Sequence, residues 1–190
     1  MKVRIVLMFL VLSTFFLSAC GQIKNAVDMP IKSFSATNQE NASFGLKDLK
    51  GKVWISDFMF TSCADVCPPM TSNMAKLQNM VKDEGLKNVE FVSFSVDPTV
   101  DSPEALTRFA KQFKVDFKNW SFLTGYSQAF IENFALKSYK TVAKKPVEGS
   151  QVIHGVDMYL VDQEGHIRKT YNGYKNVPFD EIIHDIKALQ

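Results

Sequence analysis

Two kinds of hydrophobic pattern run along this chain and predict its main elements. Residues 53–60 and 89–96 are nearly continuous apolar runs, which are typical of strands buried on both faces of a sheet. Between these runs, apolar side chains recur at helical spacing over residues 70–81, and Gly85 marks a helix stop. The order strand, helix, strand predicts two parallel strands joined by a crossover helix.

Shorter patterns predict the rest of the fold. They are a helix beginning near residue 101, a strand at 120–123, a helix at 127–136, strands at 156–161 and 166–171, and a closing amphipathic helix at 178–189. A polar stretch around residues 139–153, which includes Lys144 and Lys145, predicts an inserted loop or hairpin in solvent. Together these elements predict an α/β, thioredoxin-like fold with a central mixed sheet flanked by helices.

The first residues predict a leader rather than a part of this fold. Lys2 and Arg4 precede an apolar stretch that is short for a permanent spanning helix and ends in Leu17-Ser-Ala-Cys-Gly21. This order resembles the signal peptide and lipobox of bacterial lipoproteins, in which the cysteine is lipidated and becomes the first mature residue. We therefore expect a signal peptide at 1–19, a tether lipidated at Cys20 over 20–30, and one domain at 31–190. An uncleaved membrane anchor is the alternative.

Composition and charge limit the classes of function. A chain of 190 residues with 46% hydrophobic residues can bury the core of one compact domain and is not intrinsically disordered. The formal net charge is +2, and the predicted cleavage removes two cations and no acid, which leaves a neutral mature protein. Such a protein has no broad electrostatic attraction for nucleic acid. Lipid chains would hold it on the extracytoplasmic face of the cell membrane.

Cys63 and Cys67 are the only cysteines that remain after the predicted cleavage. A disulfide between them would close too small a loop to add much stability, so redox chemistry or metal binding is the better interpretation. Two prolines follow Cys67, and they predict a helix that begins at Pro68 or Pro69, with both cysteines in the preceding loop. The N–H groups at a helix start stabilise thiolates, so we expect lowered thiol pKa values.

Two thiolates leave a metal ion under-coordinated, so a third ligand is expected among the three histidines. His184 lies on the polar face of the last predicted helix and His166 follows a turn, so both are expected at the surface. His154 precedes a buried strand and has Gly155 beside it, which allows close approach. A histidine in this position is more often structural, but the cysteine pair favours a ligand.

Three ordered motifs resemble the Sco (SenC) family. They are the Cys-x-x-x-Cys-Pro motif within 60–68, the Ser-Val-Asp-Pro motif at 95–98 followed by Asp-Ser-Pro-Glu at 101–104, and the isolated His154. The resemblance covers essentially the whole predicted domain. It implies copper binding by Cys63, Cys67 and His154 outside a bioenergetic membrane. It also implies a role in assembling the binuclear copper A centre of cytochrome c oxidase, with oxidase subunit II as the partner.

The donor chemistry agrees with this resemblance. Soft thiolates select Cu(I) and imidazole also suits Cu(II), whereas structural zinc usually takes four protein ligands, and no fourth cysteine or histidine is evident. Binding needs reduced and deprotonated thiols, so a disulfide between Cys63 and Cys67 would switch it off. We therefore expect a metallochaperone with a redox-active, switchable cysteine pair.

Two other functions use the same cysteines. One is a membrane-tethered thiol–disulfide reductase that reduces the cysteines of the oxidase copper site or of another exported protein, and that itself needs a thiol–disulfide reductant. Reductases of this fold place a proline before the strand at 156–161, where this chain has Ile153-His-Gly155 instead. The other is a peroxidase, for which Thr61 lies one residue too close to Cys63.

Four further residues near these motifs have their own interpretations. Asp97 ends a buried strand and either tunes the metal site as an outer or weak ligand or caps the turn before Pro98. Asp101 is expected to be a helix N-cap. Met70 and Met74 share a helical stripe and are expected in the core rather than at a metal.

Overall fold

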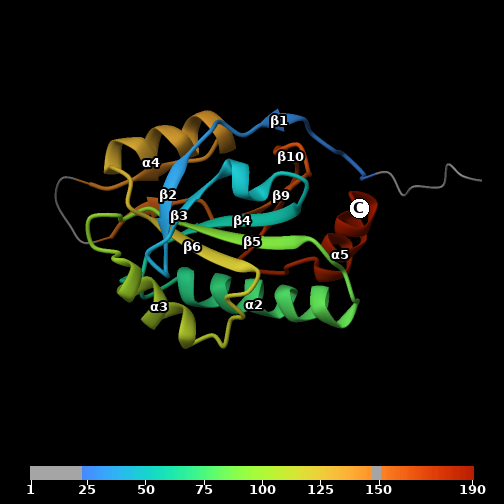
Figure 1. Ribbon diagram of the computed structural model, residues 1–190, viewed down its shortest axis with the longest axis horizontal. Helices are drawn as coiled ribbons and strands as arrows, with labels where there is room; N and C mark the ends of the chain where they lie inside the picture. The colour runs from blue at the N-terminus through green and yellow to red at the C-terminus, as the bar shows by residue number, and fades with distance from the viewer. Residues whose placement is uncertain (1–22, 147–150) are drawn as a thin grey trace, which may run out of the picture.

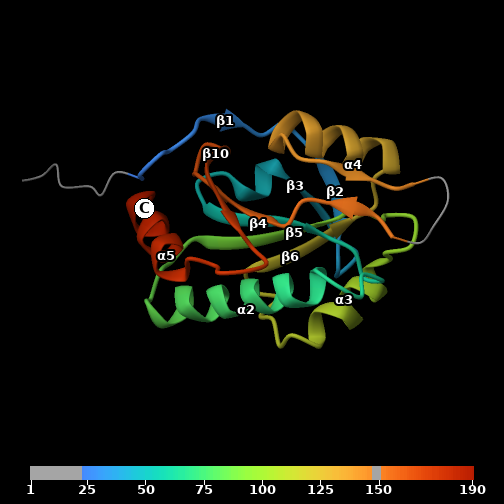
Figure 2. The same cartoon turned by 180° about the vertical axis from the view of Figure 1, so that it is seen from behind.

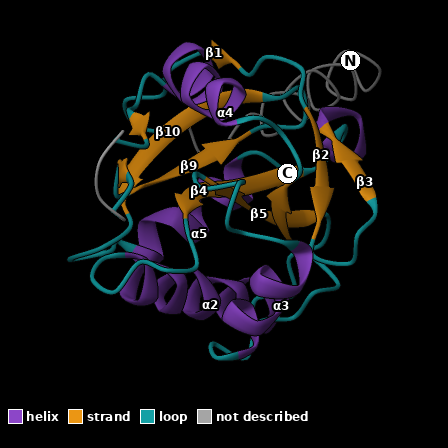
Figure 3. Ribbon diagram, turned by 90° about the vertical axis from the view of Figure 1, so that its left-hand side faces the viewer, coloured by secondary structure: helices purple, strands orange, loops and turns teal. Residues whose placement is uncertain are grey.

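The computed structural model describes residues 23–146 and 151–190. An eight-stranded mixed sheet forms the centre of the molecule, with two helices, α2 (Cys67–Asp83) and α3 (Pro103–Lys111), on one face (Figure 1). The helix α4 (Gln128–Phe134) covers the opposite face, as the end view in Figure 3 shows. The closing helix α5 (Phe179–Ala188) contacts α2. These layers confirm the predicted fold class.

The strands follow the order β1-β10-β9-β4-β5-β6-β2-β3 across the sheet (Figures 1 and 2). Their bounds are β1 (Met29–Pro30), β2 (Ser35–Asn38), β3 (Ser43–Gly45), β4 (Val53–Met59), β5 (Val89–Ser95), β6 (Trp120–Thr124), β9 (Asp157–Val161) and β10 (His166–Asn172). The pairs β4–β5 and β5–β6 are parallel, and the other neighbours in the sheet are antiparallel. The two apolar runs of the sequence are therefore the central parallel strands.

The centre of the sheet is buried because helices cover both of its faces. All seven residues of β4 are buried, which explains why its sequence is continuously apolar rather than alternating. Aromatic side chains fill the layer beneath α4. There Phe58 packs against Tyr139 with ring centroids 4.9 Å apart and against Phe94 at 5.7 Å. This packing fixes the end of β4, where the chain enters the cysteine loop.

The insertion around residues 139–153 is a hairpin, which is one of the two forms that the sequence predicted. After α4, the π-helical turn η3 (Ala135–Tyr139) extends the helical segment to Lys140, which has a left-handed backbone with φ 55°. The strands β7 (Ala143–Lys144) and β8 (Ile153–His154) then pair in a two-stranded sheet of their own. Because β8 ends at His154, the hairpin determines where this histidine lies.

The N-terminal part of the sheet differs from the sequence prediction. Met29 and Pro30 pair with β10, so the sheet includes the last two residues of the predicted tether. The 3₁₀ helix η2 (Leu46–Leu49) and the short strands β2 and β3 were not predicted, because their sequences are too short and mixed to show a period. The predicted signal peptide and Cys20 lie outside the described residues.

The start of the described chain and the start of α2 lie in different parts of the molecule. In Figure 1 the described chain begins at the right end of the molecule, whereas the N-terminal end of α2 points to the left. Within residues 23–146 and 151–190, no helix combines the length and apolar character needed to cross a bilayer.

Candidate metal centre

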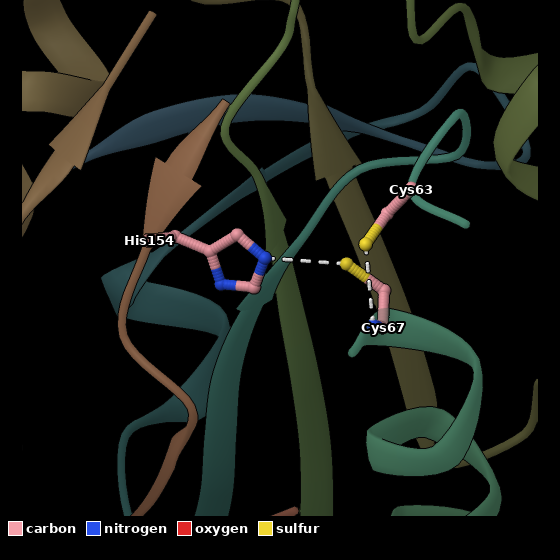
Figure 4. Close-up of side chains that lie close together, drawn as sticks. All are labelled: Cys63, Cys67 and His154. Carbon is pink, nitrogen blue, oxygen red and sulfur yellow. Dashed lines mark hydrogen bonds between the residues drawn. The ribbon is translucent and has the colours of Figure 1, made fainter. Parts of the chain in front are cut away.

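The structure brings Cys63, Cys67 and His154 together (Figure 4). Cys63 lies in the loop after β4, Cys67 is the first residue of α2, and His154 ends β8. The two sulfurs and one ring nitrogen lie within 4.8 Å of one another. Nε2 of His154 is 3.2 Å from Sγ of Cys67, although 87 residues separate them in sequence. Within the described residues, these three are the one group of cysteine, histidine and acidic side chains placed to share a metal ion.

Both cysteines are buried and carry free thiols. Cys63 is 7% exposed and Cys67 is fully buried, and no disulfide joins them. The backbone N–H of Cys67 donates a hydrogen bond to Sγ of Cys63 at 3.3 Å. An N–H group of the helix start therefore contacts a sulfur, as the sequence predicted.

Two details of the cysteine loop correct the sequence prediction. The helix begins at Cys67 rather than at Pro68 or Pro69, so only Cys63 lies fully in the loop. Burial raises the pKa of the Cys67 thiol, and the Cys63 thiol and the Asp57 carboxyl add to the rise. The expected lowered pKa is therefore wrong for Cys67, because loss of water around the sulfur outweighs the helix start. A metal ion that binds there must displace the thiol proton.

The ring of His154 is oriented as a ligand. Nδ1 lies 2.8 Å from the carbonyl oxygen of Gly155, and a carbonyl can only accept, so Nδ1 carries the proton. The lone pair of Nε2 therefore faces Cys67. Burial lowers the pKa of His154, partly opposed by the Gly155 carbonyl, so the imidazole is neutral at neutral pH. The rings of Phe60 and His154 pack at right angles to each other with centroids 5.7 Å apart.

Gly155 allows the close approach that the sequence predicted. A Cβ atom at this position would lie 2.5 Å from Oγ1 of Thr141, on the other side of the hairpin. Any side chain larger than hydrogen would therefore press against the Thr141 hydroxyl across the hairpin. The glycine lets the two arms of the hairpin lie close together beside His154.

Asp101 has a different role from the predicted N-cap. Ser102 caps α3 by accepting a hydrogen bond from the backbone N–H of Ala105 at 3.2 Å. Asp101 is fully buried, and its carboxylate accepts hydrogen bonds from Oγ1 of Thr61 at 2.6 Å and from Oγ of Ser95 at 2.5 Å. It also accepts from the backbone N–H of Thr61 at 3.2 Å. Asp101 therefore ties the cysteine loop, two residues before Cys63, to the end of β5.

Asp97 lies outside the group of three potential ligands. It is buried, and its Oδ1 accepts hydrogen bonds from Nζ of Lys145 at 2.6 Å and from Oγ1 of Thr99 at 2.9 Å. Its backbone carbonyl accepts from the N–H of Val100 at 3.0 Å, which closes the expected turn at Pro98. Tuning of the metal site by Asp97 stays a prediction.

A comparison with protein families identifies the chain. The family model described as SCO1/SenC matches residues 24–190. This chain belongs to the SCO1/SenC family. A SCO1 protein homologue of Bacillus subtilis is 48% identical over 175 residues, which cover 91% of this chain and 90% of the relative. The resemblance seen in the sequence motifs is therefore confirmed.

Solved SCO1/SenC structures share this fold. A SCO1/SenC family lipoprotein from Bacillus anthracis superposes with a TM-score of 0.85 at 50% identity, over 88% of this chain and 99% of that chain. BsSco superposes with a TM-score of 0.82 at 47% identity, over 88% and 97%. It is described as having a disulfide switch and as a member of the Sco family of cytochrome c oxidase assembly proteins. Arabidopsis thaliana ScoI with copper bound gives 0.69 at 30% identity, over 83% and 96%.

The other candidates of this SCO1/SenC protein lie where the sequence placed them. Met70 and Met74 are buried on the inner side of α2. His166 is at the surface of β10 and interacts with Asp28, and His184 is exposed on α5. None of these side chains belongs to the group that could hold a metal ion.

Asp57 is a residue near the SCO1/SenC site that sequence reasoning missed. It lies in β4 and is 1% exposed, and neither oxygen of its carboxyl makes a hydrogen bond of good geometry among the described residues. Burial raises the pKa of Asp57 to about 7, although the Ser93 hydroxyl on β5 partly opposes the rise. A single acid in the apolar run 53–60 was the available signal, because a buried carboxyl needs a reason to be there.

Proposed function

We propose that this SCO1/SenC protein binds copper through Cys63, Cys67 and His154 and acts as a metallochaperone for cytochrome c oxidase. The observation that carries the proposal is the lone pair of His154 Nε2, which faces the sulfur of Cys67 at 3.2 Å from a separate part of the chain. Thiol–disulfide exchange needs two sulfurs and does not require this nitrogen. A metal site, in contrast, uses the nitrogen as a third ligand.

The donor set fits copper in both oxidation states. Two buried sulfurs are soft donors that favour Cu(I), and a neutral imidazole also suits Cu(II). With three donors the site offers one fewer than structural zinc usually takes. Support from relatives comes from the copper-bound Arabidopsis thaliana ScoI at 30% identity.

The cysteine pair would also make copper binding depend on redox state. Oxidation would join the two sulfurs, release two protons and pass two electrons to a disulfide-bearing protein by thiol–disulfide exchange. A dithiol reductant would return the electrons and restore the ligands. The proximity of the two thiols and the disulfide switch described for BsSco at 47% identity support this proposal.

The location and partner follow from the leader and the family. A lipid on Cys20 would anchor the protein on the extracytoplasmic face of the cell membrane, as the B. anthracis lipoprotein relative suggests. The partner would be subunit II of cytochrome c oxidase, whose binuclear copper A centre would receive the copper. Delivery to that centre also needs reduced cysteines in the partner.

A thiol–disulfide reductase is the second candidate function. The observation that favours it is the difference between the two thiols, since Cys63 is 7% exposed and Cys67 is fully buried. The more accessible sulfur could attack a partner disulfide, and the buried one could then release the mixed disulfide. This function would survive replacement of His154, whereas Cu(II) binding would not.

Copper titration of reduced residues 21–190, beside His154→Ala, tests the proposal. The aligned part makes up 99% of the B. anthracis chain, so this domain folds without a leader in a relative. We expect a thiolate-to-Cu(II) charge-transfer band that saturates at one copper per protein in the wild type and is weak or short-lived in the variant. Absence of both Cu(II) and Cu(I) binding in the wild type would leave the reductase as the function.

A further inference from the structure

The hairpin that carries His154 is too short to hold itself in place. Its two strands contain two residues each, with Ala143 opposite His154 and Lys144 opposite Ile153. It forms a sheet separate from the central one. Isolated two-stranded hairpins are marginal in water even when they are longer. Contacts outside the hairpin must therefore fix the position of its histidine.

Lys145, the residue after β7, makes the contacts that fasten the hairpin to the central sheet. Its Nζ lies 2.6 Å from Oδ1 of Asp97 and 2.8 Å from Oγ1 of Thr99. The Asp97 side chain is 3% exposed and the Lys145 side chain is 29% exposed. Because this pair is mostly shielded from water and has a second hydrogen bond, it is worth more than an exposed ion pair.

Glu132 on α4 adds a second and weaker attachment. Its Oε1 accepts a hydrogen bond from the backbone N–H of Lys145 at 3.0 Å, and its Oε2 pairs with Nζ of Lys144 at 2.9 Å. The Lys144 side chain is 63% exposed, so its ion pair contributes little. The two adjacent lysines therefore differ in what they hold, although the sequence presents them as equivalent.

The attachment of Lys145 leads to the segment that also holds the cysteines. Asp97 and Asp101 both lie just after β5, and Ser95 bonds to each, accepting from the N–H of Asp97 and donating to Asp101. Asp101 fixes the cysteine loop through Thr61. One short segment, 95–101, therefore sets the position of both halves of the metal centre.

We propose that Lys145 and Asp97 are positioning residues whose ion pair holds the β7–β8 hairpin so that Nε2 of His154 faces Cys67. For copper, this inference rests on the proposed function of the three ligands. Without the ion pair the hairpin loses its attachment to the segment after β5, and His154 moves away from the sulfurs. Cu(I) can stay on the two thiolates, whereas Cu(II) loses its nitrogen ligand.

The test compares Lys145→Met with Lys145→Arg, Asp97→Asn and the neighbouring Lys144→Met in reduced residues 21–190. In Lys145→Met we expect Cu(II) to dissociate about 10–100-fold faster, as for other changes around a metal ligand, and the charge-transfer band to weaken. Cu(I) should still bind at one per protein. Lys145→Arg keeps a cation and should restore most of the wild-type behaviour, and Lys144→Met should match the wild type.

A metal-free measurement separates this inference from the copper hypothesis. Diethyl pyrocarbonate modifies neutral imidazole, and mass spectrometry can follow His154 beside the surface histidines His166 and His184 as internal references. We expect His154 to react slowly in the wild type and at least about tenfold faster in Lys145→Met, by analogy with other losses of outer contacts. The rates of the two reference histidines should not change.

Each outcome decides one of the two claims. Equal His154 reactivity and equal Cu(II) dissociation in the wild type and Lys145→Met would overturn the positioning role. Faster modification in a protein that binds no copper would support the positioning role and reject the proposed function. If Lys145→Met fails to fold, Asp97→Asn decides, because it removes the buried charge and leaves Lys145 free to reach solvent.

Discussion

The two halves of the metal centre are built in different ways. The cysteine half is part of the core, because Cys67 begins a 17-residue helix and Asp101 bonds the loop to β5 through buried hydrogen bonds. The histidine half lies on a strand of two residues in a hairpin that side chains fasten, through the Lys145–Asp97 ion pair and the weaker attachment to Glu132. In the proposed copper site, the cysteine half would supply the ligands that both copper oxidation states share. The histidine half, which is easier to move, would supply the ligand that Cu(II) needs more than Cu(I).

The largest expected effect comes from removing a sulfur of the cysteine half. Cys67→Ala should abolish stoichiometric binding of both Cu(I) and Cu(II), a far greater loss than the about 10–100-fold typical of changes outside the ligand shell. Competition with a chelator of known affinity measures it. The exposed neighbour Ser62 supplies the control, because Ser62→Ala should bind as the wild type does. Copper binding by Cys67→Ala with wild-type affinity would show that the two halves are not organised as described.

The next effect concerns the sheet beneath the cysteine half. The pKa of Asp57 is raised to about 7 by burial, above the ordinary value of 3.8, so the folded protein binds this proton more tightly than the unfolded chain. The free energy of unfolding should therefore fall as the pH rises from about 4 to above 7, by at most about 4 kcal/mol. Asp57→Asn should remove this part of the slope.

Urea unfolding at about pH 5 and about pH 8 measures the contribution of Asp57. Asp65 is an exposed acid in the cysteine loop, so Asp65→Asn should keep the wild-type slope and serves as the control. Identical slopes in the wild type and Asp57→Asn would mean that Asp57 ionises normally. Burial of Asp57 would then not lower the free energy of unfolding as the pH rises.

A smaller effect distinguishes the fastening of the cysteine loop from helix capping. Asp101→Asn replaces an acceptor oxygen that receives hydrogen bonds from Thr61 and Ser95, and should cost about 2–3 kcal/mol of unfolding free energy. Ser102→Ala removes the actual N-cap and should cost about 1 kcal/mol. Denaturant unfolding of both variants gives the ranking. The reverse order would indicate that Asp101 is not the main fastening of the loop.

The smallest effect concerns the histidine half. Gly155→Ala places a methyl group 2.5 Å from Oγ1 of Thr141 and should cost about 1 kcal/mol, with Cu(II) dissociating a few-fold faster. Replacing Thr141 by Ala as well removes the clashing atom and should restore the wild-type dissociation rate. The copper dissociation rates of the single and double variants check this. Failure of the second substitution to restore the rate would separate the effect from the clash.

The central fold could be predicted from the sequence because its signals are long. The runs at β4 and β5 and the stripe of α2 repeat over enough residues to show their period. The strands β2 and β3 contain four and three residues and gain their place because they pair with each other and β2 pairs with β6. Such pairing depends on distant residues, so a local pattern could not show it.

The site divides in the same way. The grouping of Cys63, Cys67 and His154 was predictable because their side chains are chemically distinctive and few in number. The roles of Asp101 and Lys145 were not, because each depends on a partner about 40 residues away or more in sequence. Asp101 also precedes Ser102, and both residue types suit an N-cap, so the pattern could not choose between them. The pKa of Cys67 was misjudged because the helix start can be read from the neighbouring sequence, whereas burial depends on residues far away in the chain.

The position of the metal centre within the molecule has a consequence for copper transfer. The described chain begins at the right end of the molecule, whereas the N-terminal end of α2 points to the left (Figure 1). At about 1.5 Å per residue, the 17 residues of α2 alone extend ~25 Å along this direction. If lipid on Cys20 holds the start of the described chain near the bilayer, the three proposed ligands would lie at a distance from the lipid headgroups. A receiving protein would then have to present its copper site at that height, and changes in tether length would alter the rate of transfer without altering copper affinity.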